Sequence, residues 1–260
     1  MNIIVCVKAV PDTATKIKVA ANGVKIDPEG VKYVMGPYDA RACAKAIELR
    51  DALGAATHKV IAISSGGSEG ERDARKRLKD ALALGADKGI HIPDPDPELR
   101  DPLSVAKALA AAIKAQPDVK LVFFGRQAVD DQCLAVGPMV AALLGLPCVT
   151  DAVALEVSGD KAVVTRAAEQ RIETIEVGLP AAISAQRDLA EEKYAKLKDI
   201  LASGKKPIET FKFDWPAPAW EVRRLAPPPA RTAGKIVGQG PDAVPLLLDL
   251  LQKEAKALTL

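Results

Sequence analysis

Short apolar runs alternate with helical patterns through the first 150 residues of this chain. The expected strands cover residues 2–7, 59–64, 90–92 and 121–124, and the expected helices cover residues 39–53, 71–84, 103–115 and a pattern ending at 144. The first and last strand runs are continuously apolar, which is typical of parallel strands covered on both faces. This rhythm predicts a doubly wound, mostly parallel α/β sheet of the Rossmann-like, adenine-nucleotide-binding kind, with right-handed crossovers.

Past Pro147 the helical patterns stop and hairpin patterns begin. The strands expected there would extend the sheet with antiparallel members, and they cover residues 153–157, 162–165, 171–177 and 181–184. Near the N-terminus, Asn22-Gly23 is a turn signal that predicts a small hairpin between residues 17–19 and 24–26. Asp39 has the short acidic side chain typical of an N-cap, so it is predicted to cap the helix that follows it.

The C-terminal part of the chain changes pattern again, from hairpins to a charged segment, a proline-rich segment and a final helix. Residues 188–203 are charged and predict a helix, whereas five prolines between Trp215 and Pro229 predict an extended arm. A final helical pattern carries one apolar stripe, formed by Val244, Leu247, Leu248, Leu251, Ala255 and Leu258. Such a stripe must be buried on its own domain or on a partner. We therefore expect an α/β domain in residues 1–210, followed by an arm and a helix in residues 211–260.

Composition excludes several classes of protein. The chain is 48% hydrophobic and 27% charged, with a net charge of +2, and no basic stripe indicates a nucleic-acid interface. The four cysteines are widely separated and predict mostly buried free thiols in a reducing compartment. No apolar run is long enough to cross a membrane, and the first residues lack the pattern of a secretory leader. These features predict a cytoplasmic protein without direct membrane insertion.

In an open α/β sheet, ligands bind at the carboxyl ends of the strands. Three loops rich in small and polar residues are expected there, covering residues 8–12, 64–68 and 125–136. Gly125 would let a ligand approach the backbone closely, and the first turn of the next helix suits a phosphate. Arg126 would add a cation, and Gln127 and Asp130 would orient a ribose or a base. An ordinary loop with a solvated charge cluster is the alternative, because one glycine-led loop is a weak motif.

The sequence shows no catalytic machinery beside these loops. Residues 65–69 superficially resemble the pyrophosphate loop of adenylating enzymes, but they follow the second strand and carry Glu69 where Asp is usual. His58 precedes a strand and His91 lies within one, so both are interpreted as structural. No Ser-His-Asp set, HExxH motif or paired carboxylates are visible. A nucleotide site without catalytic groups predicts a carrier or binding protein, not an enzyme.

Several motifs, in the same order along nearly the whole chain, resemble the small (beta) subunit of electron-transfer flavoproteins. Each motif is weak alone, and together they are specific. They are Val7-Lys8-Ala9-Val10-Pro11-Asp12, Gly36-Pro37-Tyr38-Asp39, Ala83-Leu84-Gly85-Ala86-Asp87, Gly125-Arg126-Gln127-Ala128-Val129-Asp130-Asp131, Leu179-Pro180-Ala181, Tyr194-Ala195-Lys196-Leu197 and Arg231-Thr232-Ala233-Gly234.

The resemblance implies a heterodimer with a larger alpha subunit, which holds most of the FAD, while this chain binds AMP and shapes one side of the flavin site. Electrons would arrive from acyl-CoA dehydrogenases of fatty acid oxidation and leave to a membrane quinone oxidoreductase. A docking loop would span residues 189–206, with Tyr194, Leu197, Ile200 and Leu201 as candidate contacts. The implied AMP contacts are Cys6, Ala9, Gly36, Pro37, Tyr38, Asp39, Ser65, Gly66, Gly125, Arg126, Gln127, Ala128, Val129, Asp130, Asp131, Gln132, Cys133, Leu134, Ala135 and Val136.

The chain departs from the family pattern in three places. Gly36 stands where many members have Asn, Thr13 stands where some have an aromatic residue, and residues 67–82 are about one helical turn longer. Bifurcating relatives bind a second FAD in place of AMP and tend to show Asp-Gly-Asp where this chain has Asp130-Asp131-Gln132. That type, and a stand-alone adenine-nucleotide sensor akin to universal stress proteins, are the alternatives. The arm and the final helix count against the sensor, since a sensor domain needs neither.

Overall fold

The structure is a computed structural model that describes residues 1–67, 74–97, 100–230 and 233–258. Its contacts divide the chain into two units, Met1–Leu225 and Ala226–Leu260, which are described separately. The elements in chain order are β1 (Asn2–Cys6), β2 (Ala9–Pro11), β3 (Tyr33–Met35), α1 (Pro37–Leu53), β4 (Lys59–Gly66), α2 (Ala74–Leu84), β5 (Lys88–Pro93), α3 (Pro102–Lys114), β6 (Val119–Gly125), α4 (Val136–Leu144), β7 (Cys148–Ser158), β8 (Lys161–Ala167), β9 (Ile172–Gly178), β10 (Ala181–Ala185), the 3-10 helix η2 (Arg187–Leu189), α5 (Leu197–Ser203), β11 (Ile208–Thr210), the 3-10 helix η3 (Pro241–Ala243) and α6 (Val244–Lys253).

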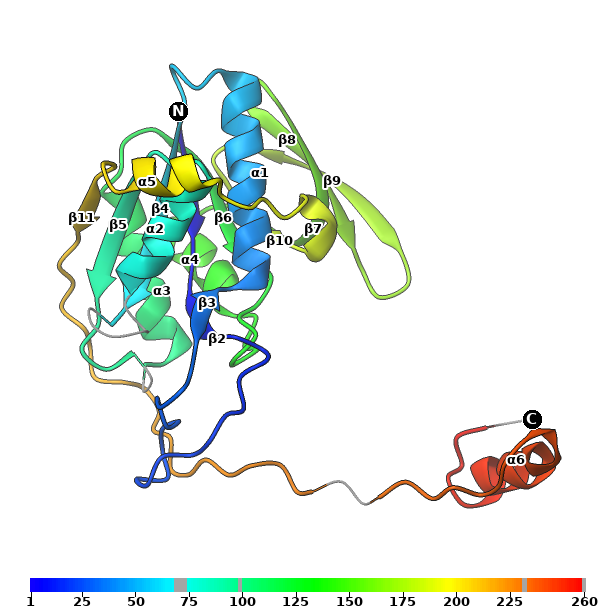
Figure 1. The fold of residues 1–260 in the computed structure, drawn as a ribbon. Coiled ribbons are helices and arrows are strands. Elements are labelled where there is room, and N and C mark those ends of the chain that lie inside the picture. The colour runs from blue at the N-terminus through cyan, green and yellow to red at the C-terminus, as the bar shows by residue number, and fades with distance from the viewer. Residues whose placement is uncertain (68–73, 98–99, 231–232, 259–260) are drawn as a thin grey trace. The chain divides into compact units, whose positions relative to one another are not determined.

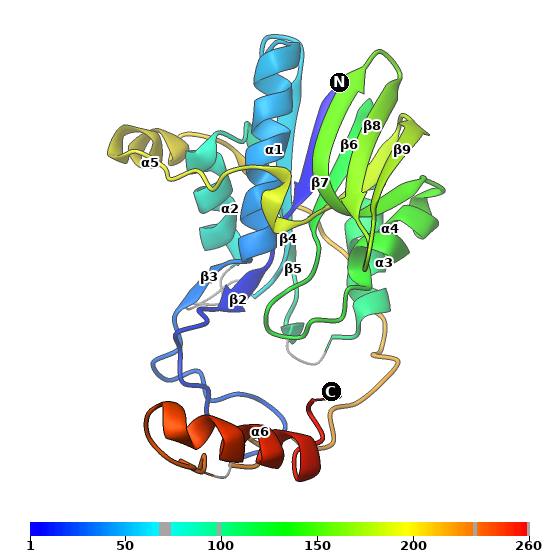
Figure 2. The same ribbon diagram turned by 90° about the vertical axis from the view of Figure 1, so that its right-hand side faces the viewer.

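The described residues of the first unit form one large sheet with the strand order β11-β5-β4-β1-β6-β10-β7-β8-β9. Neighbours from β11 through β7 are parallel, and β7, β8 and β9 are antiparallel. Helices α1 and α2 cover one face of the sheet, and α3 and α4 cover the other (Figures 1 and 2). The predicted α/β fold with added antiparallel strands is therefore confirmed.

Two apolar cores flank the central strands. Ile3 and Val5 of β1 pack toward α1 and α2, whereas Ile4 and Cys6 pack toward α3 and α4. Successive side chains of a strand point to opposite faces, so a strand covered on both faces needs an unbroken apolar run. This is why β1 and β6 were recognisable from sequence.

The segment between β1 and α1 differs from the prediction. The hairpin expected across residues 17–26 is reduced to a single bridge between Val19 and Ile26, and the short pair β2–β3 forms instead. The N-cap of α1 is Gly36 rather than Asp39, and Pro37 occupies the first turn. Pro suits that position because its missing N–H has no helical partner there. Asp39 therefore lies inside the helix, and its carboxylate accepts hydrogen bonds from the backbone of two other segments instead of capping α1.

The end of the first unit holds two further differences. Residues 188–203 are not one helix, because only η2 and α5 form and the residues between them are irregular. β11 pairs in parallel with β5 and extends the sheet by a strand of three residues. Residues 215–225 have no regular structure, as expected for a proline-rich arm. The extra turn expected near residues 67–82 lies partly outside the described residues.

The second unit contains η3 and α6. Helix α6 ends at Lys253, so Ala255 and Leu258 of the predicted stripe lie beyond it. Apolar side chains along α6 are exposed, including Leu246 at 51% and Leu247 at 42%. Among the described residues, no helix combines the length and apolar character needed to span a membrane.

The four cysteines are free thiols. Cys6 and Cys43 are buried, as predicted, and burial raises the pKa of the Cys43 thiol to about 12. Cys133 and Cys148 are exposed, so the expectation of mostly buried thiols holds for two of the four.

Candidate functional site

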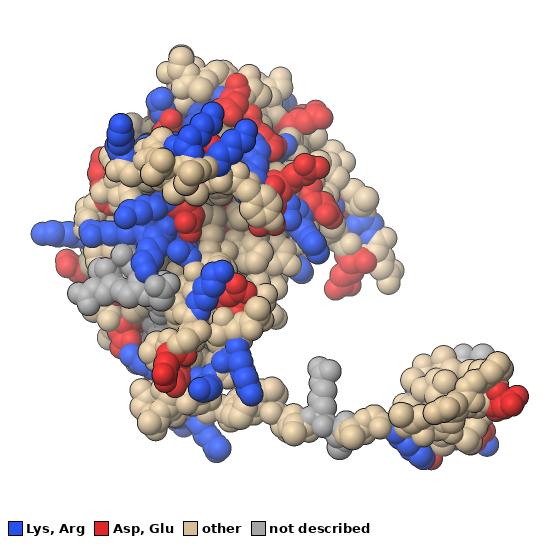
Figure 3. All heavy atoms as spheres, in the orientation of Figure 1, with Lys and Arg blue, Asp and Glu red and all other residues tan. Residues whose placement is uncertain are grey.

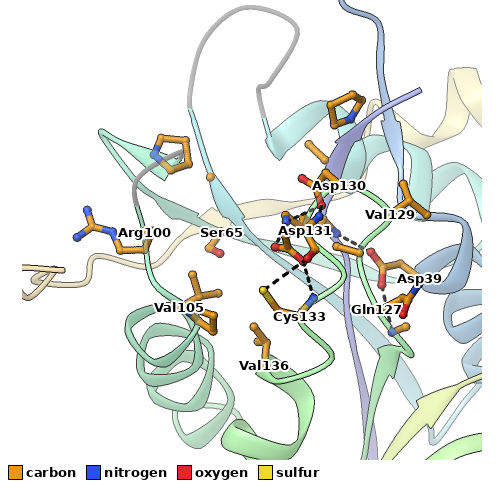
Figure 4. A pocket seen from close by; sticks show the side chains of 18 of the residues that line it. Asp39, Ser65, Arg100, Val105, Gln127, Val129, Asp130, Asp131, Cys133 and Val136 are labelled. Atoms are coloured by element: carbon orange, nitrogen blue, oxygen red, sulfur yellow. Dashed lines mark hydrogen bonds and ion pairs between the residues drawn. The ribbon is translucent and has the colours of Figure 1, made fainter. Parts of the chain in front are cut away.

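A cavity of about 730 Å³ opens at the carboxyl ends of β1, β4 and β6. Cys6, Gly66 and Gly125 are the last residues of these three strands, and all three line the cavity. The loop after β6 forms much of the wall and leads into α4 (Figure 4). The three loops expected to converge at this edge of the sheet therefore do so.

Most of the sequence-predicted contact residues line this cavity, and four do not. Gly36, Pro37 and Tyr38 lie at the start of α1, where only Asp39 of that motif reaches the cavity, and Gln132 is outside the lining. The residues that line it are Cys6, Ala9, Asp39, Ser65, Gly66, Gly125, Arg126, Gln127, Ala128, Val129, Asp130, Asp131, Cys133, Leu134, Ala135 and Val136.

Asp39 joins the ends of two strands beneath the cavity. Its carboxylate accepts hydrogen bonds from the backbone N–H of Lys8 at 2.9 Å and of Gly125 at 3.1 Å. Burial raises the pKa of this carboxyl to about 7, against the opposing effect of the two backbone donors. The carboxylate also explains Gly36, because a Cβ there would lie 2.5 Å from Asp39 Oδ2.

Lys8 bridges the two carboxylates of the loop after β6. Its Nζ lies 2.9 Å from Asp130 Oδ1 and 2.8 Å from Asp131 Oδ2. The pKa of Asp131 is lowered, because the attraction of Lys8 and the hydrogen bonds it receives outweigh its partial burial. The pKa of Lys8 is raised, because these two carboxylates outweigh its own burial. This ion-pair cluster ties the loop to the segment that follows β1.

The other basic side chains in the cavity wall are also paired. In the part of the chain that the structure describes, these pairs are Lys25–Asp96, Arg100–Asp94 and Arg126–Asp151. Each of these described cations, like Lys8, therefore already has a carboxylate beside it. A ligand carrying several negative charges would have to compete with those carboxylates for the cations.

Helix α4 begins at the wall of the cavity. Ala135, its N-cap, and Val136, its first residue, both line the cavity, and no side chain caps this end. The first N–H groups of a helix lack partners within the helix and carry partial positive charge. The start of α4 therefore offers donors to one anionic group without a basic side chain.

Sequence reasoning missed the wall contributed by distant segments. Val105 and Leu109 of α3, Arg100, and Trp220 of the arm also line the cavity. Nothing in their local patterns marks them, because tertiary packing alone brings them to the site. One weak signal existed: both tryptophans of the chain lie in the arm, and a large aromatic side chain usually finds something to pack against.

The predicted docking residues lie apart from the cavity lining. Tyr194, Leu197, Ile200 and Leu201 are 82%, 73%, 51% and 70% exposed. At least half of each of these side chains is exposed, although α5 as a whole lies against α2 of the same domain. Lys206 Nζ donates to the carbonyls of Leu82 and Ala86 and so ties the segment to the end of α2. Lysine and arginine side chains gather on the face that carries α2 and α5 (Figure 3).

Comparison with known proteins connects the chain to a protein family. The sequence model of the electron transfer flavoprotein domain family matches residues 23–215 of this chain. The electron transfer flavoprotein subunit beta of Homo sapiens is 35% identical, covering 96% of this chain and 98% of its own length. The mitochondrial beta subunit of Oryza sativa subsp. indica is 37% identical over 99% and 100% of the two chains, and that of Arabidopsis thaliana is 36% identical over 98% and 99%.

The expectation of a cytoplasmic location is contradicted by these relatives. Those from Oryza sativa and Arabidopsis thaliana are named as mitochondrial proteins. The expectation was drawn from free thiols, from the lack of long apolar runs and from the lack of a secretory leader pattern. None of these properties distinguishes one reducing compartment of the cell from another, which is why the inference was wrong.

Proposed function

Because this chain belongs to the electron transfer flavoprotein family, among its beta subunits, we propose that it is the AMP-binding half of a heterodimeric electron carrier. Its larger alpha partner holds most of the FAD, which supplies the redox chemistry, and this chain shapes one side of the flavin site. Electrons come from acyl-CoA dehydrogenases and pass to a membrane quinone oxidoreductase. The observation that carries the proposal is the cavity at the ends of β1, β4 and β6 in a chain of this family.

The cavity suits a mononucleotide. Its volume falls in the range of small-molecule sites, and Val105, Leu109 and Val136 give it an apolar wall that would take an adenine ring. The start of α4 would bind the phosphate through backbone N–H groups. Since the basic side chains around the cavity are already paired, a single phosphate fits better than a di- or triphosphate.

A second FAD in place of AMP is the competing ligand, as in bifurcating members of the family. The size of the cavity favours it, because about 730 Å³ exceeds what one mononucleotide occupies. The paired cations and the sequence Asp130-Asp131-Gln132 favour AMP. The stand-alone sensor loses its support, since relatives named as flavoprotein subunits match the chain over nearly its full length.

We assign the two exposed apolar surfaces to two kinds of partner. The segment with Tyr194, Leu197, Ile200 and Leu201 is small and suits transient docking of a dehydrogenase. Residues 226–260, with the exposed apolar face of α6, suit the permanent contact with the alpha subunit. This division lets the carrier release each dehydrogenase while it keeps its cofactors.

The ligand content of the purified alpha–beta complex tests this function. After denaturation and chromatography, AMP and FAD should appear in a ratio near one to one. Two FAD and no AMP would mean that the bifurcating alternative is correct. If AMP and FAD appear in no fixed ratio to the protein, both the AMP-binding function and the bifurcating alternative are contradicted.

A pair of variants at the start of α4 tests the phosphate position. Ala135→Asp places a negative charge beside the expected phosphate. Ala135→Asn adds a side chain of the same size without a charge, so the pair isolates the effect of the charge. We expect Asp to reduce AMP content at least tenfold and Asn to keep it, with both variants folded. Equal AMP content in the two variants would place the phosphate elsewhere.

A further inference from the structure

Residues 208–225, here called the strap, run from the sheet edge past β5 and α3. β11 pairs with β5, and the backbone N–H of Phe211 then donates to the carbonyl of His91 at 2.8 Å. Phe213 and Trp215 pack against the core under α3, with their ring centroids 5.2 Å apart. The strap is therefore part of the first unit and is not a free linker.

Arg100 fastens the strap at its centre. Its Nε and Nη2 donate to the carboxylate of Asp94 at 3.1 and 2.9 Å, and its Nη1 donates to the carbonyl of Pro216 at 2.9 Å. The guanidinium also lies over the ring of Trp215, 4.6 Å from its centroid. The side chains of Arg100 and Asp94 are only 9% and 2% exposed, so the arrangement is shielded from solvent. One planar cation thus holds a carboxylate, a carbonyl and an aromatic ring together.

The strap continues over the cavity after this fastening. The backbone N–H of Ala219 donates to Asp101 Oδ2 at 3.1 Å, and that of Leu225 donates to the carbonyl of Gly23 at 2.7 Å. Between these two bonds, Trp220 and Val222 line the cavity. Arg100 lines it as well, on the side opposite Asp39 (Figure 4). The strap and its fastening residue therefore form one wall of the site.

We propose that Arg100 is a positioning residue of the nucleotide site, which retains the nucleotide by holding the strap closed. This inference rests on the proposed function, in which the cavity holds AMP. Release of the nucleotide then requires the contacts of Arg100 with Pro216 and Trp215 to break first. The loop after β6 recognises the ligand, and the strap sets how long the ligand stays.

Exchange of bound AMP for isotopically labelled AMP in the alpha–beta complex tests the proposal. Arg100→Lys keeps a cation for Asp94, but a single ammonium cannot also reach Pro216 and lie flat on Trp215. We expect AMP to leave the variant at least tenfold faster, with flavin content nearly unchanged and the complex still folded. Arg41→Lys is the matched control, because Arg41 donates to the carbonyl of Ala190 and so ties down another C-terminal segment away from the cavity. Its exchange rate should stay within twofold of the unmodified complex.

Hydrogen exchange gives a second readout that needs no variant. In the unmodified complex, peptides covering residues 216–225 should exchange more slowly with AMP bound than after AMP is removed, since Ala219 and Leu225 donate from the strap.

If Arg100→Lys does not fold, Trp215→Phe removes the N–H that donates to Pro93 and should also speed AMP release. Unchanged AMP release in folded variants, or strap exchange indifferent to AMP, would overturn the role of Arg100 while leaving the proposed function intact. A complex that contains no AMP would overturn both.

Discussion

The Oδ1 oxygen of Asp39 accepts a hydrogen bond from the backbone N–H of Gly125 across 86 residues of sequence. The other carboxylate oxygen accepts from Lys8, so one side chain in the first turn of α1 ties the end of β6 to the residues that follow β1. Both strands end at the cavity. The geometry of the candidate site therefore depends on a side chain that comes from outside the loops themselves.

Gly125→Ala should damage the site through this contact. A Cβ at position 125 would lie 2.8 Å from the backbone nitrogen of Asp39 and from Tyr38 Cβ, and it would meet the Asp39 carboxylate. Either β6 or α1 has to move, which typically costs about 1–3 kcal/mol in a packed region. We expect a lower free energy of unfolding and reduced AMP content. Gly178→Ala is the control, because a Cβ there meets nothing within 4 Å; equal effects of the two substitutions would contradict this explanation.

Asp39 should also make stability depend on pH. Its pKa is about 7 in the folded chain, against about 3.9 in an unfolded one. Between these values the folded chain binds more protons than the unfolded chain, so the contribution of Asp39 to the free energy of unfolding falls as pH rises from about 4 to about 7. The fall is at most about 4 kcal/mol, and it is complete above pH 7.

Asp39→Asn isolates this effect, because Asn does not titrate. The free energy of unfolding of the variant, relative to the original chain, should rise between pH 5 and pH 8 in denaturant titrations. Asp101→Asn is the control, because the pKa of Asp101 is shifted in the opposite direction to that of Asp39. Hydrogen bonds from Ser104 and Ala219 overcome burial and lower the pKa of Asp101. Its contribution is present above about pH 4 and is lost only below that pH, so its difference from the original chain should stay constant from pH 5 to 8. Parallel curves for Asp39→Asn would show that this carboxyl is ionised throughout.

Leu197→Ala should slow electron transfer from an acyl-CoA dehydrogenase by roughly tenfold, without changing flavin content, AMP content or melting temperature. The side chain is 73% exposed, so its removal takes nothing from the core, whereas a buried leucine at an interface contributes about 1.5–3 kcal/mol. Leu189→Ala, on the same segment, gives the opposite pattern, since Leu189 is 4% exposed and its truncation should cost about 2–5 kcal/mol of stability. Normal transfer kinetics in Leu197→Ala would move the docking surface elsewhere.

The elements that sequence patterns predicted are those whose own residues carry the signal. β1, β6 and α3 are long enough for apolar periodicity to appear, and the rule that ligands bind at strand ends then located the cavity. β2, β3 and β11 have three residues each, and they become strands only because a partner lies alongside. No local pattern specifies such a partner.

The candidate site shows the same limit. The loop after β6 was predictable, because a glycine after a buried run and before a helix has a local meaning. The function of Asp39 was not, since an acidic residue at a helix start suggests capping, and its amide partners are 31 and 86 residues away. Arg100 was missed for a similar reason: its partner Pro216 is 116 residues away in the chain.

Deletion of residues 226–260 should abolish retention of the alpha subunit while the remaining domain stays folded. The cut falls between the two units, and it spares Phe211, Phe213 and Trp215, which pack against the core of the first unit. Among its described residues, the deleted part has no buried side chain and exposes apolar ones such as Ile236 at 85% and Leu246 at 51%. An obligate interface of the expected kind buries about 2,000 Å² or more, so its loss should be evident when alpha is co-expressed and the complex is purified through beta.

The double variant Ile236→Ser with Leu246→Ser should weaken retention of alpha by the full-length chain, and Lys253→Ser, on the same helix as Leu246, should not. A shortened chain that still holds alpha in equal amount would place the subunit contact in residues 1–225 instead.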